Sequence, residues 1–136
     1  MNLSRRHALA LLAAAACRRR GSGFDGYALV AAAGSRNVAI IDLLAFARKG
    51  SIPLPHEPTA LLAHPDPEAR RAYAVMAGHS AIAEISPGSP AVLRRLTLPA
   101  HPHIVRIAGG RLYWIDPARN WLGGVDLKEW KQLRTI

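Results

Sequence analysis

A pattern that occurs three times constrains the fold of this chain more than any other feature. Each copy begins with a tyrosine-led apolar segment, passes through a short polar break, and ends with a second apolar segment that closes on Asp or Ser. The copies span residues 27–42, 73–86 and 113–126. Short apolar segments bounded by turn-forming residues are typical of β-strands, so each copy predicts a pair of strands.

A second pattern lies between the copies, and it fixes the length of the repeat. Residues 52–62 and 96–106 both contain a histidine and a proline that starts an apolar segment, and the two prolines, Pro58 and Pro102, are 44 positions apart. The last residues of the three copies are spaced by 44 and then 40 positions. A period in the low forties is typical of four-stranded β-propeller blades.

The repeat therefore predicts an all-β fold of antiparallel blades with eleven strands, grouped as three, four and four. The expected blades span about residues 24–55, 58–98 and 102–136, and the first of them lacks one strand. The continuous apolar segment 38–43 is expected to be buried on both faces. Because propeller rings contain about four to eight blades, three blades form an incomplete ring. The chain is expected to be a fragment of a longer propeller or a subunit that completes its ring by self-association.

The same residues resemble a known repeat. The tyrosine-led strand, the second strand with its Ile-Asp end at 41–42, and the following proline-started strand are similar to the YVTN-type repeat of bacterial lactonase-like β-propellers. The resemblance covers residues 24–136. Repeats of that type carry a Pro-Asp-Gly turn, from which residues 65–67 depart by an insertion, while residues 108–110 keep only the glycine. The resemblance implies the fold and leaves the activity open.

The first twenty residues have the layout of an export signal. A short basic segment with Arg5 and Arg6 precedes the apolar residues 8–16, and small residues lead to Cys17. Such a segment is too short to span a bilayer and is typical of a secretory signal. Residues 4–9 resemble a twin-arginine signal. Residues 14–17 resemble a bacterial lipobox, although its usual leucine is alanine here.

We therefore interpret residues 1–23 as an export signal and a flexible tether that ends in Gly-Ser-Gly. The protein is expected to be periplasmic, or anchored on the periplasmic side of the membrane through lipidated Cys17. Two alternatives remain at this stage. Cleavage without lipidation would release a soluble periplasmic protein, and a chance apolar segment would leave the protein in the cytosol.

Charge and composition exclude some classes of partner. The formal net charge is +9, but most of the arginines are scattered, and only 6% of the residues are aromatic. A nucleic-acid surface requires a basic stripe and often stacking aromatics, so no nucleic acid is expected as a partner. Cys17 is the single cysteine and excludes an intrachain disulfide.

The predicted topology gathers histidines on one loop face. In an up-and-down blade, the turn between the second and third strands and the crossover to the next blade lie at the same end of the sheet. His56, His79, His101 and His103 fall in these segments and are weak candidates for a metal or anionic ligand. Because no spacing typical of a metal motif accompanies them, and a histidine beside proline commonly caps backbone groups, we predict no metal site and no cofactor.

The sequence gives no support for catalysis. It contains no Gly-x-Ser-x-Gly elbow and no glycine-rich phosphate loop. Asp42 and Asp126 end equivalent strands and are expected to accept hydrogen bonds from local turn amides. Trp114, Trp121 and Trp130 are expected to pack between blades.

The leading hypothesis is a non-catalytic propeller module of the cell envelope that binds a protein or a small ligand on its loop face. The alternative is the N-terminal part of a propeller enzyme, either a lactonase-like hydrolase or a protein similar to periplasmic dehydrogenases. In that case its catalytic residues lie elsewhere.

Overall fold

The structure is a computed structural model that describes residues 23–32 and 34–136. The predicted export signal and the lipidation site at Cys17 lie outside these residues. Within them, no helix is long and apolar enough to cross a lipid bilayer.

In the described part of the chain, eleven strands form three antiparallel sheets, so the predicted all-β fold and the grouping into three, four and four strands are confirmed. The first sheet contains β1 (Tyr27–Ala31), β2 (Asn37–Asp42) and β3 (Ala47–Pro53). The second sheet contains β4 (Ala60–Ala63), β5 (Ala72–Met76), β6 (Ala81–Ser86) and β7 (Ala91–Thr97). The third sheet contains β8 (Ile104–Ala108), β9 (Arg111–Asp116), β10 (Trp121–Asp126) and β11 (Lys131–Gln132). Two short 3₁₀ helices, η1 (Pro67–Ala69) and η2 (Ala77–His79), lie in loops of the second sheet.

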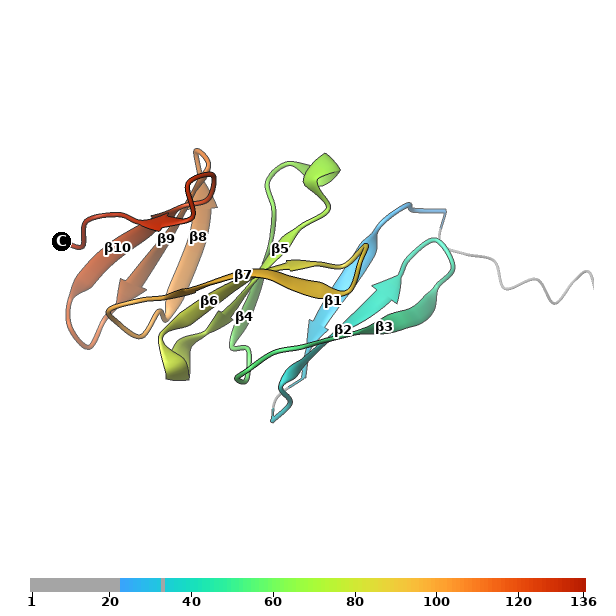
Figure 1. Cartoon of the computed structure of the whole chain (residues 1–136), viewed down its shortest axis with the longest axis horizontal. Coiled ribbons are helices and arrows are strands. Elements are labelled where there is room, and N and C mark those ends of the chain that lie inside the picture. Colours follow the sequence, from blue (N-terminus) through green and yellow to red (C-terminus); the bar gives the residue numbers. More distant parts are fainter. Residues whose placement is uncertain (1–22, 33) are drawn as a thin grey trace, which may run out of the picture.

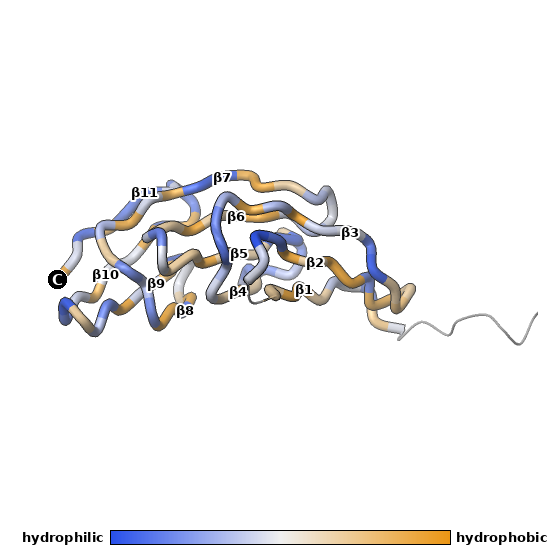
Figure 2. Tube along the Cα trace, turned by 90° about the horizontal axis from the view of Figure 1, so that it is seen from below, coloured by the Kyte–Doolittle hydropathy of each residue, from blue (hydrophilic) through white to orange (hydrophobic). Residues whose placement is uncertain are grey.

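The three sheets stand side by side in chain order, with the second sheet between the other two (Figure 1). Strands follow their order in the chain across each sheet, and Figure 2 shows the outer strands β7 and β11 along one long side of the molecule, with β4 and β8 toward the other. One apolar core lies between the first and second sheets, and another lies between the second and third. This arrangement is that of consecutive propeller blades.

Tight turns follow from the residues at the strand ends. Gly109 and Gly110 both have positive φ and form the two-residue loop that joins β8 to β9, which matches the preference of such hairpins for glycine. The carboxylate of Asp42 accepts a hydrogen bond from Ala45 N at 2.9 Å. Asp126 accepts two from its own turn, at 3.0 and 2.9 Å. The prediction that these two aspartates bind turn amides is confirmed.

Strand register corrects the alignment of the three tyrosines. Tyr73 and Tyr113 each pair with the residue two positions before the end of the next strand, whereas Tyr27 pairs with the last residue of that strand, Asp42. Leu29 is therefore the structural equivalent of Tyr73. The tyrosine-led pattern marks the strand in all three sheets, but it marks the same position in only two of them.

The expectation that residues 38–43 are buried on both faces is wrong. Val38 and Ile40 are fully buried against the second sheet, whereas Ala39 and Ile41 point to the other face and are only partly buried. Among the described residues, no sheet covers that second face of the first sheet. The apolar residues on it indicate a surface suited to packing.

Candidate functional site

The loops lie at two ends of the sheets. The crossover end holds the connections between sheets and the turns β1–β2, β5–β6 and β9–β10. The hairpin end holds the turns on the other side, which join β2–β3, β4–β5, β6–β7, β8–β9 and β10–β11. The four candidate histidines, His56, His79, His101 and His103, fall in segments of the crossover end.

Two of the predicted histidines are in contact at the crossover end. The rings of His56 and His79 are stacked, with centroids 3.6 Å apart and an interplanar angle of 8°. Burial lowers the pKa of His56, and the neighbouring positive charges of His79, Arg36 and Arg95 lower it further. His56 therefore favours its neutral imidazole form on this basic surface.

The other two histidines make contacts of their own, apart from this pair. The Nδ1 atom of His101 lies 3.1 Å from Ser80 Oγ and 2.9 Å from Ala77 O. Its backbone N–H donates to the carboxylate of Asp116 at 3.2 Å. His103 is exposed, and its backbone N–H donates to a carbonyl of β9. His101 therefore ties the second sheet to the third.

These contacts do not bring the four histidines together into one site. Across the part of the chain that the structure describes, no group of three or more His, Cys, Asp or Glu side chains is placed to hold a metal ion. The carboxylate of Asp116 is bound to the turn that follows it. It accepts hydrogen bonds from the backbone N–H groups of Ala118 and Arg119, and one from the Arg119 guanidinium at 2.8 Å. The hydrogen bond from Arg119 also lowers the pKa of Asp116.

A cleft lined by charged side chains lies at the hairpin end, between the second and third sheets. Its volume is about 650 Å³. Residues from both sheets line it: His64, Pro65, Arg71, Glu84, Leu93, Arg94, Gly110, Leu127 and Lys128. A hollow of about 540 Å³ between the first and second sheets shares His64 and Arg71 with this cleft.

A buried carboxylate lies in the wall of the cleft. Glu84 lies in the middle of β6 and is only 1% exposed. Its Oε1 accepts a hydrogen bond from Arg71 Nη1 at 3.1 Å, and its Oε2 accepts one from Arg94 Nε at 2.6 Å. Burial alone would raise the pKa of Glu84, but the hydrogen bonds and charges of Arg94 and Arg71 outweigh burial and hold it below the ordinary value. The carboxylate is therefore ionised at neutral pH.

Arg94 joins the two sheets through this carboxylate. Its Nη2 donates to Leu127 O at 3.0 Å and its Nη1 to Lys128 O at 3.4 Å, both in the turn between β10 and β11. Its guanidinium also lies 4.6 Å from the ring centroid of Trp130. Every nitrogen of Arg94 thus has a partner, so this residue is a structural clamp between the sheets.

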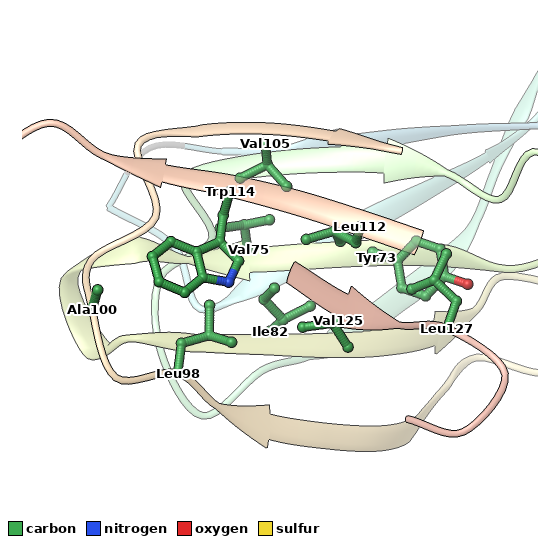
Figure 3. Packing of buried hydrophobic residues seen from close by; sticks show 10 residues of the cluster. All are labelled: Tyr73, Val75, Ile82, Leu98, Ala100, Val105, Leu112, Trp114, Val125 and Leu127. Atoms are coloured by element: carbon green, nitrogen blue, oxygen red, sulfur yellow. The ribbon is translucent and has the colours of Figure 1, made fainter. Parts of the chain in front are cut away.

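Tyr73 adds an unusual polar group beside the clamp. Its ring stacks near Trp130 with centroids 6.2 Å apart, and Figure 3 shows its hydroxyl beside Leu127 at one end of the buried cluster. The hydroxyl is buried, and no hydrogen-bond partner for it lies among the residues that the structure describes. Burial raises the pKa of Tyr73 to about 12, with a further contribution from the negative charge of Glu84. A buried donor without a partner calls for an explanation such as a water or a ligand.

The repeat shows that Glu84 is a departure from the pattern. The strands β2, β6 and β10 are equivalent in the three sheets, and Glu84 lies two residues before the end of β6. The same position holds Ile40 in β2 and Gly124 in β10. A charged residue at an apolar packing position is destabilising unless it is fully paired. Positions where a chain breaks its own local rule tend to be functional, and Glu84 is such a position.

The tryptophans behave differently from one another. Trp114 is fully buried between the second and third sheets, and Trp130 packs on Tyr73 and donates to Arg95 O at 3.1 Å. For these two, the predicted packing between blades is confirmed. For Trp121 it is wrong, because this residue is exposed and its ring lies 5.7 Å from the guanidinium of Arg119.

Comparison with solved structures identifies the fold. AztD from Citrobacter koseri superposes with a TM-score of 0.70 at 16% identity, over 85% of this chain and 33% of that one. Hydrazine synthase from Kuenenia stuttgartiensis gives a TM-score of 0.63 at 14% identity, over 74% and 29% of the two chains. The dihydro-heme d1 dehydrogenase NirN gives 0.64 at 15% identity, over 88% and 25%. These are propeller-type folds, and the chain has the same type of fold.

The chain spans only about a third or less of the length of these similar structures. No family model and no curated protein matches the sequence.

Proposed function

We propose that the chain is a non-catalytic β-propeller module that binds a small anionic ligand in the cleft between its second and third sheets. One observation carries the proposal. The cleft is open at the hairpin end and holds an ionised carboxylate that is already neutralised by two arginines. Pockets of this size with a few converging polar groups are the usual places for small ligands.

The charge of the cleft favours an anion. Arg71, Arg94 and Lys128 contribute three positive charges against the single negative charge of Glu84. Arg94 is fully engaged, but the side chain of Arg71 is 45% exposed and uses one nitrogen for Glu84. Among the described residues, Lys128 forms no ion pair and is exposed. Arg71 and Lys128 are therefore the two groups that would hold a carboxylate or phosphate.

The state of Glu84 supports binding over catalysis. A general acid or base needs a pKa near the working pH and a free oxygen. Glu84 has a lowered pKa, and each of its oxygens accepts a hydrogen bond from an arginine. It therefore serves to position the arginines and not to transfer protons.

A second candidate is a segment of a propeller enzyme whose catalytic residues lie in other blades. It is favoured by similarity to NirN and hydrazine synthase, which carry enzyme names and are three or more times longer than the matched region. On this hypothesis the cleft would contribute a binding subsite to a larger protein. For the family of this chain, we propose the bacterial β-propellers with YVTN-type repeats.

For location, we propose export to the cell envelope, with Cys17 as the first residue of a lipidated mature protein. The layout of residues 1–17 supports it. Mass analysis of the mature N-terminus tests it, since a chain that retains Met1 would contradict export.

Binding of citrate and of inorganic phosphate tests the proposed function. Trp130 contacts Arg94, which lines the cleft, so the fluorescence of Trp130 is a suitable readout of binding. We expect Arg71→Gln to raise the Kd for citrate by about tenfold or more, since a charge-assisted hydrogen bond contributes about 1.5–3 kcal/mol and each ~1.4 kcal/mol is a factor of ten.

The matched control is Arg36→Gln, which removes the same charge from an exposed site at the crossover end. It is expected to leave the Kd within about twofold. Equal weakening by both variants, or no binding of either anion, would contradict an anion site in the cleft.

A further inference from the structure

Two broad sheet faces are left uncovered by the rest of the described chain. The far face of the third sheet carries Ile104, Ile115 and Leu122, which lie in register across β8, β9 and β10. Their exposed fractions are 51%, 39% and 39%. Three neighbouring large apolar side chains at the surface indicate a packing surface.

The repeat identifies what such a face packs against. Leu122 and Ile82 each lie four residues before the end of the equivalent strands β10 and β6, so they occupy the same position. Their partners on the neighbouring strands, Ile115 and Val75, are equivalent as well. Ile82 and Val75 are both fully buried in the core between the second and third sheets. The far face of the third sheet therefore has the composition of a face that covers the next sheet.

The far face of the first sheet is the matching half. It carries four apolar residues on β1 and β2, and each has an equivalent in the second sheet that packs against, or is buried beside, the first sheet. The side chains are nearly the same at each position: Ala28, Val30, Ala39 and Ile41 correspond to Ala72, Ala74, Ala83 and Ile85. One chain thus presents both halves of the contact that it already makes twice internally.

We propose that a second copy of this chain docks on these faces, so that the third sheet of each copy packs on the first sheet of the other. The contact is head-to-tail, and it continues the series of sheet contacts within the chain. In Figure 1 the first and third sheets lie at opposite ends of the row, as such a contact requires. Two copies give six sheets, which is within the range of about four to eight blades of closed propellers. A head-to-tail contact forms a ring when its rotation closes.

The mass of the purified chain by light scattering coupled to size-exclusion chromatography tests this inference. One copy has a mass of 14.7 kDa. A head-to-tail pair has twice the mass of the processed chain, measured in salt that screens the exposed Arg48 and Arg106 on the two faces. A folded monomer would overturn the proposal and leave these faces to sheets of another chain. A ladder of higher masses would overturn ring closure.

Two variants distinguish the head-to-tail contact from other dimers. Leu122→Glu alters the third sheet and Val30→Glu alters the first, and both residues are exposed, so the isolated chain should keep its fold. Each variant alone is expected to halve the mass. The matched control Leu44→Glu changes an equally exposed residue in the β2–β3 turn and should leave the mass doubled.

An equimolar mixture of Leu122→Glu and Val30→Glu is the most specific test of the head-to-tail contact. One of the two contacts in a mixed pair is intact, so the mixture should recover part of the doubled mass that neither variant shows alone. A dimer through two third sheets would respond to Leu122→Glu and ignore Val30→Glu. That result would overturn the proposal.

Discussion

Replacing Glu84 by glutamine is expected to lower the free energy of unfolding by about 2–3 kcal/mol at neutral pH. The substitution keeps the shape of the side chain but leaves Arg71 and Arg94 without their counter-charge. Removing one partner of a fully buried ion pair costs about 3–5 kcal/mol. The side chains of Arg71 and Arg94 are 45% and 33% exposed, so water compensates part of that loss. Chemical denaturation followed by Trp fluorescence measures the change.

The loss should depend on pH in a defined direction. The folded-state pKa of Glu84 is lowered, so the folded protein favours the ionised carboxylate more than the unfolded chain does. Its contribution is therefore present above the ordinary carboxyl value of 4.5 and is lost as the pH falls through the folded-state value. The difference between the wild type and Glu84→Gln should shrink below pH 4.5.

The matched control is Glu129→Gln, which removes the same charge from an exposed position in the β10–β11 turn. Exposed substitutions of this kind change stability by about 0.5 kcal/mol or less. A loss for Glu84→Gln that is equally small, or that is the same at pH 3 and pH 7, would show that the carboxylate is not held as described.

Replacing Gly123 by alanine is expected to destabilise the chain by about 2–3 kcal/mol, because overpacking in a closed core costs about that much. Trp114 lies directly over Gly123, and a Cβ there would overlap the indole atoms Cζ2, Cε2 and Cη2. The indole is fully buried between the second and third sheets, so it has no room to move away (Figure 3). Thermal and chemical unfolding both measure the effect.

A double-mutant cycle separates this overlap from a general effect of alanine. In a Trp114→Leu background the ring is gone, and the added cost of Gly123→Ala should fall close to zero. Gly88→Ala is the matched control, since Gly88 has open space around its Cα and no positive φ, and it should be neutral or slightly stabilising. Additive costs in the cycle would contradict direct contact between Gly123 and Trp114.

The fold was predictable because the repeat is encoded locally. Strand ends, Asp-capped turns and the two glycines of the β8–β9 loop each appear in a few consecutive residues. Alignment by tyrosines failed in the first sheet, because Tyr27 and Tyr73 differ by two positions in register. A residue type marks a strand, whereas only the hydrogen-bonded pairing determines the position within it.

The candidate site was not predictable in the same way. In the sequence, Glu84 is a single polar residue within an apolar strand, and that contrast was the one available signal. Its partners Arg71 and Arg94 are 13 and 10 residues away, and only the pairing of β6 with β7 and the path of the β4–β5 loop bring them to it. The histidines were candidates because of their residue type, yet the structure separates them into a stacked pair, a network around His101, and an exposed His103.

A map of where a small anion binds on the folded chain tests the proposed anion site most directly. Amide chemical shifts of the ¹⁵N-labelled protein should be followed during titration with citrate. An anion site in the cleft predicts shifts that saturate together at four lining residues of the hairpin end, His64, Arg71, Gly110 and Lys128. The amide chemical shifts of His79 and His101 at the crossover end should stay unchanged. Shifts spread over exposed arginines without saturation, or confined to the crossover end, would contradict the cleft between the second and third sheets as the binding site.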